Sequence, residues 1–333
     1  MVSPNPSDPS MPDRDSGRVA EHSNWLVRAE LALVLRYGAN SVAVLAMAVA
    51  MLLWIVIEKS GGEVLAAVPP LELVWLRYLV HLALMLVFVA PRQPLQLFRT
   101  RYPALQIGRS VLMLGMPLFW IMAAIRMPMP TVMAIFWAVP LIAVVLAAVL
   151  MRERPSVVLG ALIGLGYLGT LLMLRPGMPP GRGGPVFALA MAGCFALYLV
   201  GTRWLRREPT QVNLFHSALS VFVLLTPVMP YVWRWPTPQS LVPILVIGVL
   251  GYVVLWCLDR ALHLAPVAAV APVMFVQASI EMLWFGGIHS ASSGLPLAGL
   301  LLVCVAVIGA AMHARRIRGN AAETSDPLME PSA

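Results

Sequence analysis

The stretch that decides the fold is MPMPTVMAIFWAVPLIAVVLAAVLMRERPSVVLGALIGLGYLGTLLML, residues 127–174. Residues 127–151 contain no Asp, Glu, Lys or Arg, and neither do residues 155–174. Each of these apolar runs is about as long as the ~20 residues that a helix needs to cross the ~30 Å hydrocarbon layer. The stretch therefore predicts two transmembrane helices joined by the short charged segment Arg152-Glu153-Arg154.

Segments of the same kind recur along the chain, which is 60% hydrophobic and carries Asp, Glu, Lys or Arg at only 11% of its positions. Adding the apolar segments that contain a few charged residues gives ten spans. We therefore predict an all-α membrane protein with ten transmembrane helices. The predicted spans are residues 39–57, 71–90, 107–125, 129–150, 156–174, 185–203, 211–232, 240–258, 264–288 and 295–313.

The Lys and Arg residues lie mostly on one side of this arrangement. With the N-terminus inside, seventeen of the 23 basic residues face the cytoplasm, five face outward, and Arg77 lies within a span. The five outward residues are Lys59, Arg126, Arg175, Arg182 and Arg234. The positive-inside rule requires such a bias, and nine or eleven spans would blur it. We therefore predict a multi-pass protein of the cell inner membrane with both termini cytoplasmic.

The two ends of the chain differ from the spans in composition. The first 24 residues are rich in Pro, Ser and Asp and lack the apolar core of a signal peptide. We expect residues 1–30 to form a disordered cytoplasmic tail and residues 314–333 to form a second tail. Residues 25–37 mix apolar and charged positions, which favours a short amphipathic helix along the membrane surface before Gly38.

Several function classes are disfavoured by what the sequence lacks. The cations are spread over short loops, so nucleic-acid binding is not expected. Cys194, Cys257 and Cys304 lie inside spans with no pairing pattern, so we expect no disulfide and no metal site. The sequence contains no HExxH motif, no phosphate loop and no cluster of His, Cys and Asp at ligand spacing. We therefore expect no enzyme and no cofactor.

A carrier, a channel and a non-transporting scaffold or accessory subunit stay as alternatives, and the absence of a filter motif disfavours the channel. Six prolines within spans are expected to interrupt helices: Pro117, Pro140, Pro227, Pro243, Pro266 and Pro272. Interrupted helices in corresponding spans of two halves indicate a transporter's substrate path. Pro140 and Pro272 lie in the fourth and ninth spans, so we predict a gating role for both. The glycines within residues 160–169 are expected to serve close helix packing.

A faint internal duplication divides the spans into two halves. Residues 124–127, Ala-Ile-Arg-Met, resemble residues 261–264, Ala-Leu-His-Leu, and each segment precedes the fourth span of its half. Because each half has five spans, an odd number, the second half must be inverted relative to the first. We therefore predict two inverted five-helix repeats, residues 31–176 and residues 183–313.

Between Arg109 and Pro176 the chain has an Arg-Ser start, an Ala-apolar-Arg triplet, a mid-span proline, a Glu-Arg pair and a Gly-rich span that ends in Arg-Pro. In this pattern it resembles the first repeat of the EamA-type carriers of the drug/metabolite transporter superfamily. The matching residues are Arg109, Ser110, Pro140, Glu153, Arg154, Gly160, Arg175 and Pro176. Residues 271–277, APVMFVQ, resemble the family's A-P-x-x-Y-x-Q segment. Ser290 stands where the family usually has an acid, and Glu281 within the span is unusual.

The resemblance implies a secondary carrier that moves a small polar or zwitterionic metabolite across the inner membrane by alternating access. Within the family, the first repeat is most similar to carriers of riboflavin, S-adenosylmethionine or related metabolites. The expected partners are a small-molecule metabolite and the lipid bilayer. Substrate identity, transport direction, the driving ion and formation of a homo-oligomer stay open at this level.

Ionisable groups inside a span cost ~2.5–3.5 kcal/mol on insertion scales, so each needs a role. Arg77 and His81 share one face of the second span, and Gln277 and Glu281 share one face of the ninth. Arg77 and Glu281 lie at about the same depth, so we predict that they face a common outward cavity. All four residues are candidates for binding substrate or a proton. The alternative is that these groups pair with each other and lock the helices.

Aromatic side chains and one acid complete the candidate site. Trp137 and Tyr252 lie on spans that line the cavity in the resembled family, and we predict that they stack on a planar or cationic substrate. Packing alone is the alternative. Asp259 is expected to pair with Arg109 or with one of the arginines of residues 152–154 and to close a cytoplasmic gate. A static pair at the helix ends is the second interpretation.

Overall fold

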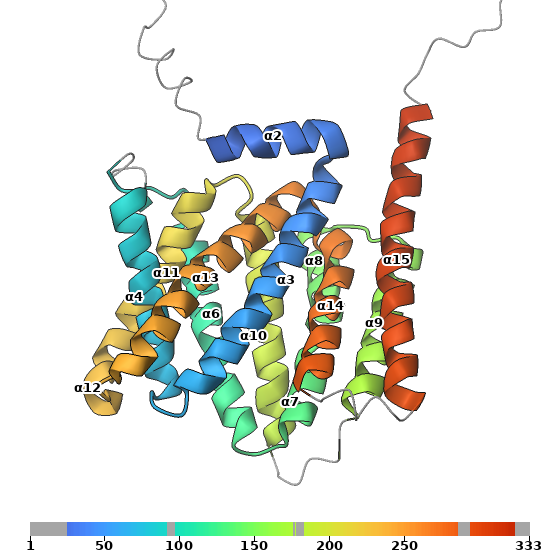
Figure 1. The fold of residues 1–333 in the computed structure, drawn as a ribbon. Coiled ribbons are helices and arrows are strands. Elements are labelled where there is room, and N and C mark those ends of the chain that lie inside the picture. Colours follow the sequence, from blue (N-terminus) through green and yellow to red (C-terminus); the bar gives the residue numbers. More distant parts are fainter. Residues whose placement is uncertain (1–24, 92–96, 176, 178–182, 286–293, 324–333) are drawn as a thin grey trace, which may run out of the picture.

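A computed structural model describes residues 25–91, 97–175, 177, 183–285 and 294–323, and the regular structure among these residues is helical (Figure 1). Within the described residues, nine segments are long and apolar enough to cross a membrane, and a further apolar helix, Val267–Glu281, is shorter. The predicted all-helical membrane fold is confirmed in this form. Residues 286–288, at the end of the predicted ninth span, lie outside the described residues.

The helices follow the order of the predicted spans. They are α2 (Trp25–Tyr37), α3 (Ala39–Val64), α4 (Pro70–Phe88), α6 (Pro103–Ala124), α7 (Met129–Phe136), α8 (Val139–Met151), α9 (Val157–Leu174), α10 (Gly184–Trp204), α11 (Thr210–Leu225), the 3-10 helix η1 (Thr226–Val228), α12 (Met229–Val232), α13 (Pro238–Leu264), α14 (Val267–Phe285) and α15 (Gly294–Glu323). The pair α7 and α8 forms one candidate span, and α11, η1 and α12 together form another.

Figure 1 shows α2 lying across one end of the bundle, where it meets α3 at a sharp corner. The corner is Gly38, whose φ of 80° is a conformation that glycine adopts without strain. Glu30 of α2 pairs with Arg260 near the end of α13, with 3.0 Å between Arg260 Nε and Glu30 Oε2. The predicted surface helix is thus present. Residues 25–30 belong to it rather than to a disordered tail, and α15 continues past residue 313 to Glu323.

Helices approach one another most closely at glycines. A Cβ atom at Gly169 of α9 would lie 2.6 Å from the carbonyl oxygen of Gly299 in α15, and one at Gly299 would lie 2.5 Å from the carbonyl oxygen of Gly169. A Cβ atom at Gly166 would lie 2.6 Å from the ring of Phe275 in α14. Such contacts let helix backbones pack closely in lipid. The predicted packing role therefore holds at these two glycines, whereas the other two in the run have open space beside them.

The fourth predicted span is interrupted next to Pro140, as the sequence predicts. α7 ends at Phe136 and α8 starts at Val139, with Pro140 in the first turn of α8. Beside the break, the hydroxyl of Tyr167 donates a hydrogen bond to the carbonyl oxygen of Ala134 (3.2 Å). A backbone carbonyl released from the helix is thus satisfied by a neighbouring helix, as apolar surroundings require.

The other prolines fall into two groups. Pro227 lies in η1 and Pro266 lies between α13 and α14, so both mark helix boundaries. Pro117, Pro243 and Pro272 lie inside continuous helices, and the prediction that they interrupt their spans was wrong. A proline removes one N–H donor, and a packed bundle in lipid tolerates that loss without ending the helix. The fourth predicted span is therefore interrupted at its proline, whereas the ninth continues as a helix through Pro272.

Candidate functional site

Polar side chains of the spans gather into two clusters near opposite ends of the bundle. The Arg109 cluster consists of Arg109, Gln106, Thr202, Asn213, Ser217 and Asp259, all of them buried. The Glu281 cluster consists of Trp54, Glu58, Arg77, Gln277 and Glu281. The Arg109 cluster lies near the end that carries α2, because Asp259 is only five residues from the end of α13. Glu281 lies fourteen residues along α14, or ~21 Å from its start.

Arg109 is the centre of the first cluster. Its Nη1 lies 3.7 Å from Oδ1 of Asp259 and donates to the hydroxyl of Thr202 (3.1 Å). Its Nη2 donates to the carbonyl oxygen of Asn213 (2.6 Å) and to the hydroxyl of Ser217 (2.7 Å). The side-chain amide of Asn213 donates in turn to Asp259 (3.1 Å). Of the arginines considered for Asp259, Arg109 is the one in contact, and its guanidinium joins α6 to α10, α11 and α13.

A second, partly buried ion pair lies at the same end of the bundle. Nε of Arg203 lies 3.0 Å from Oε1 of Glu153, and Nη1 of Arg203 donates to the carbonyl oxygens of Leu262 and His263 (2.8 and 3.1 Å). The second oxygen of Glu153 accepts a hydrogen bond from the backbone N–H of Val267 (3.2 Å). Glu153, which belongs to the motif that carries the family resemblance, therefore ties the end of α8 to α10 and to the start of α14.

The Glu281 cluster is built around two carboxyl groups. Oε1 of Glu281 accepts a hydrogen bond from the side-chain amide of Gln277, one turn earlier in α14. Glu58 of α3 is the carboxyl group that interacts with Glu281 from a second helix, and it accepts a hydrogen bond from the indole N–H of Trp54 (2.8 Å). An ionised carboxylate only accepts hydrogen bonds, so two carboxyl groups bond to each other only when one carries a proton. A direct hydrogen bond between Glu58 and Glu281 would therefore need a proton on one of the two carboxyl groups.

Arg77 approaches this cluster through an aromatic ring. Its guanidinium carbon lies 5.3 Å from the ring centre of Trp54. Gly251 of α13 provides the room, because a Cβ atom there would lie 2.4 Å from Nε of Arg77. Among the described residues, no carboxylate oxygen lies within 4.0 Å of this guanidinium. Trp54 therefore lies between the two predicted charges, with its ring against Arg77 and its N–H on the carboxyl pair that includes Glu281.

A row of aromatic rings joins the two clusters. The ring centre of Trp54 lies 6.2 Å from that of Phe195, which lies 6.2 Å from that of Tyr198. The guanidinium carbon of Arg109 lies 5.2 Å from the Tyr198 ring. Phe136, at the end of α7, lies 5.8 Å from Phe195. The rings thus extend from one guanidinium to the other, and all four are buried.

Four polar atoms in this region are buried and have no hydrogen-bond partner among the described residues. They are Nη2 of Arg77, the hydroxyl of Tyr78, Nε2 of His81 and Nε1 of Trp137. The His81 ring lies 6.1 Å from the Tyr78 ring and 5.0 Å from the Tyr252 ring. An unpaired buried polar group costs ~1–3 kcal/mol, so these atoms are candidates for contact with a bound molecule.

Two members of the Glu281 cluster were missed in the sequence. The predicted first span ended at residue 57, which put Glu58 in an outward loop, whereas α3 continues to Val64. The available signal was the four-residue spacing of Trp54 and Glu58, which puts both on one helix face. Asn213 and Ser217 were also missed, although they share that spacing. A neutral polar residue costs less in an apolar span than a charged one and is therefore a weaker signal of function.

Part of the chain matches a known protein family. Residues 41–175 match the model of the EamA-like transporter family. The matched region contains α3 to α9, including Arg77, Arg109 and the α7–α8 break. This is a family of transporters rather than of enzymes. The resemblance predicted from residues 109–176 is thereby confirmed.

Distant relatives and a solved structure extend this finding. The S-adenosylmethionine uptake transporters of Rickettsia prowazekii (strain Madrid E) and Rickettsia conorii (strain ATCC VR-613 / Malish 7) are each 22% identical to this chain. The matches cover 184 and 186 residues, 55% and 56% of this chain, and the chain spans 63% of the length of either relative. A crystal structure shares the fold with a TM-score of 0.69 at 22% sequence identity, over 83% of this chain and 99% of that chain.

Proposed function

This chain is a multi-pass membrane protein related to the EamA-like transporters, and we propose that it is a secondary carrier for a small polar or zwitterionic metabolite. It works by alternating access between two inverted five-helix halves, residues 31–176 and 183–313, in the cell inner membrane. Both termini are cytoplasmic in this proposal. Arg203 and Arg260 support this orientation. Both lie at the end of the bundle that carries α2, and basic residues favour the cytoplasmic side of a membrane.

The observation that carries the proposal is the Glu58–Glu281 carboxyl pair beside Arg77. Ionisable groups inside a membrane span are costly and therefore typical of functional sites. In this proposal the two carboxyl groups share a proton in the absence of substrate, and a cationic group of the substrate takes its place. The unpaired Nη2 of Arg77 is available to an anionic group of the same substrate. The site therefore suits a molecule that carries both charges.

The aromatic row defines the rest of the substrate. A planar ring stacks between aromatic faces, and the unpaired Nε2 of His81 and Nε1 of Trp137 can hydrogen-bond to polar atoms of that ring. S-Adenosylmethionine carries a sulfonium cation, an amino-acid group and a planar purine. The substrate named for the Rickettsia relatives thus has the chemistry that this site requires, and we take it as the first candidate.

The Arg109 cluster serves as the inner gate in this proposal. Arg109 lies on α6 in the first half and Asp259 on α13 in the second, so movement of one half against the other separates this pair. The break at Pro140 and the proline at position 272 are the places where α8 and α14 change direction during the movement. The Glu153–Arg203 pair reinforces the same closed end.

Counterflow in proteoliposomes tests the proposal. Vesicles that contain the purified protein and unlabelled S-adenosylmethionine are expected to take up the labelled compound, whereas protein-free vesicles are not. A thermal-shift screen of metabolites identifies the substrate independently, because a ligand at a hundred times its Kd stabilises the folded state by ~2.7 kcal/mol. Stabilisation and exchange with another metabolite would reassign the substrate. Absence of exchange with every stabilising metabolite would favour a scaffold or accessory subunit instead.

A further inference from the structure

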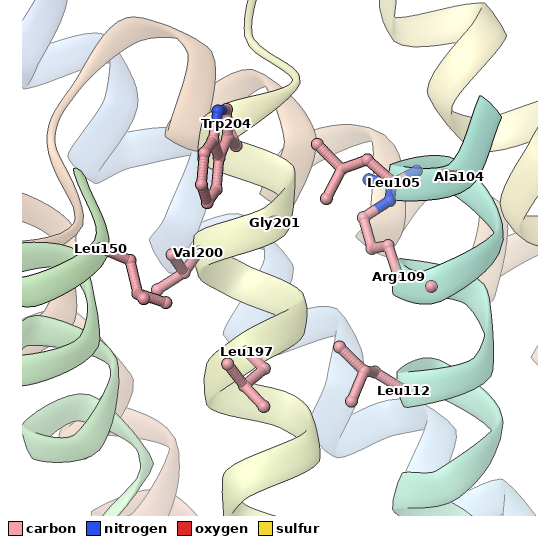
Figure 2. Close-up of a pocket in the computed structure, with 10 residues that line it drawn as sticks. Ala104, Leu105, Arg109, Leu112, Leu150, Leu197, Val200, Gly201 and Trp204 are labelled. Carbon is pink, nitrogen blue, oxygen red and sulfur yellow. The ribbon is translucent and has the colours of Figure 1, made fainter. Parts of the chain in front are cut away.

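A groove of about 370 Å³ opens between α6, α8 and α10, near the end of the bundle that carries α2 (Figure 2). Its walls are apolar. They include Leu105 and Leu112 of α6, Leu150 of α8, and Leu197 and Val200 of α10. Figure 2 shows Leu105, Arg109 and Leu112 of α6 pointing toward α10, with Val200 and Trp204 of α10 on the side toward Leu150 of α8. The groove is separate from the Glu281 cluster and from the aromatic row.

Glycines keep this groove open. Gly108 lies in the α6 wall, and a Cβ atom there would meet no neighbouring heavy atom within 4 Å. Gly201 lies in the α10 wall, where a Cβ atom would contact the side-chain carbons of Arg109 at 3.6 Å. The groove extends along α10 from Trp204 to Leu197, seven residues or ~10 Å of helix. A narrow apolar slot of this length fits the upper part of an acyl chain.

The mouth of the groove is cationic. A second pocket of about 320 Å³ shares Leu150 and Trp204 with the groove and is lined in addition by Tyr102, Arg206 and Arg207. Both arginines are exposed, and among the described residues no carboxylate oxygen lies within 4.0 Å of either guanidinium. Trp204 and Tyr102 are 53% and 46% exposed, as is typical of aromatic residues at the membrane–water boundary.

We propose that this groove binds one anionic glycerophospholipid. One acyl chain lies between α6 and α10, and Arg206 and Arg207 hold the phosphate group at the mouth. The order of the lining matches the order of groups in such a lipid, from cations through boundary aromatics to an apolar slot. Basic pockets between transmembrane helices on the cytoplasmic side are a known form of lipid recognition.

The position of the groove links the lipid to the inner gate. The floor of the groove includes Arg109, whose guanidinium is held by Thr202 of α10 and by Asp259 of α13. A bound acyl chain therefore packs against the α6–α10 contact in the arrangement in which the Arg109 cluster is closed. The lipid stabilises this closed arrangement, and its effect on folding is independent of which metabolite the protein carries.

Lipid binding to the purified full-length protein tests the proposal. Delipidated protein in detergent is titrated with phosphatidylglycerol or with phosphatidylcholine of the same acyl chains, and adducts are counted by native mass spectrometry. We expect one phosphatidylglycerol to be retained and to raise the Tm, with phosphatidylcholine binding at least about tenfold more weakly. Equal binding of the two lipids would overturn the proposal and indicate ordinary contact with the surrounding bilayer.

Two variants locate the lipid. Arg206→Gln with Arg207→Gln is expected to abolish the preference for phosphatidylglycerol, whereas Arg234→Gln at the opposite end leaves it unchanged. Gly108→Leu fills the apolar slot and is expected to remove the adduct. Gly193→Leu is its matched control, because a Cβ atom at Gly193 of α10 also has no neighbouring heavy atom within 4 Å. An unchanged preference for phosphatidylglycerol in the double arginine variant, or retention of the adduct by the Gly108→Leu protein, would overturn the proposal. No transport assay enters this test, so its outcome is separate from that of the proposed carrier function.

Discussion

Nη1 of Arg109 lies 3.7 Å from Oδ1 of Asp259, and both side chains are only 1% exposed. The two residues lie on α6 and α13, which belong to different predicted halves of the chain. Neutral hydrogen-bond partners surround the pair, and Nδ1 of His263 lies 3.2 Å from Oδ2 of Asp259. A buried ion pair of this kind contributes little net stability when intact but is costly to break, because the remaining charge has no counterion.

Loss of one member of this pair is therefore expected to destabilise the protein strongly. We expect Asp259→Ala to lower the free energy of unfolding by ~3–5 kcal/mol, as measured by unfolding of the purified protein in detergent micelles. Combining it with Arg109→Met is expected to cost less than the sum of the single changes. Glu30→Ala removes the partner of the half-exposed Arg260 and serves as the control, with a loss of ~1 kcal/mol or less. Additive effects of the two buried changes would show that the pair is not coupled.

Neutralising the carboxyl pair tests the substrate site. Glu58→Gln and Glu281→Gln keep the size of each side chain and a hydrogen-bonding group but remove the charge and the shared proton. We expect each change, and Arg77→Gln, to reduce counterflow at least about tenfold, because losing one member of a buried charged contact costs ~2–5 kcal/mol in binding. Glu30→Gln, on the surface helix, is the matched control. Wild-type exchange by the Glu281→Gln protein would show that this carboxyl group is structural.

The two prolines for which we predict a gating role are expected to differ in their effect on transport. Pro140 stands in the first turn after the α7–α8 break, whereas Pro272 lies inside the continuous helix α14. We therefore expect Pro140→Ala to restore a continuous fourth span and to cut counterflow about tenfold, with the protein still folded and abundant. Pro272→Ala is expected to have a smaller effect on the same assay. An active Pro140→Ala carrier would mean that the break serves packing and not movement.

The orientation of the chain is tested with topology reporters. Fusions after Arg154 and after Arg207 are expected to report the cytoplasm, and a fusion after Arg182 the outside, because the basic residues favour the inner side. The measurement is the paired activity of a reporter active only inside and one active only outside. An external signal after Arg154 would overturn the ten-span arrangement.

Much of the fold could be predicted because membrane spans are determined by length and apolarity, which are local properties. The break at Pro140 was predictable because the missing backbone N–H of proline is also a local property. Whether Pro272 breaks its helix was not, since the outcome depends on the packing of neighbouring helices. At the Pro140 break, the neighbouring helix α9 contributes in this way, because the hydroxyl of Tyr167 donates a hydrogen bond to the carbonyl oxygen of Ala134.

The candidate site was predicted residue by residue but not in its contacts. Glu281 and Arg77 were identified because a charge inside a span is conspicuous. Their connection through Trp54 and Glu58 was missed. Composition alone placed the end of the first span at residue 57, whereas α3 continues to Val64 and includes Glu58. The partner of Asp259 was narrowed to three arginines, and only tertiary packing selects Arg109.

The Gly38 corner fixes where any mismatch between protein and bilayer thickness must be absorbed. Because α2 lies across one end of the bundle and is tied to α13 by the Glu30–Arg260 pair, we expect that end to keep a constant height in the headgroup region. A thicker or thinner bilayer therefore shifts the hydrocarbon boundary at the opposite end, close to Glu58 and Lys59. The polarity around the carboxyl pair thus depends on the acyl-chain length of the host membrane.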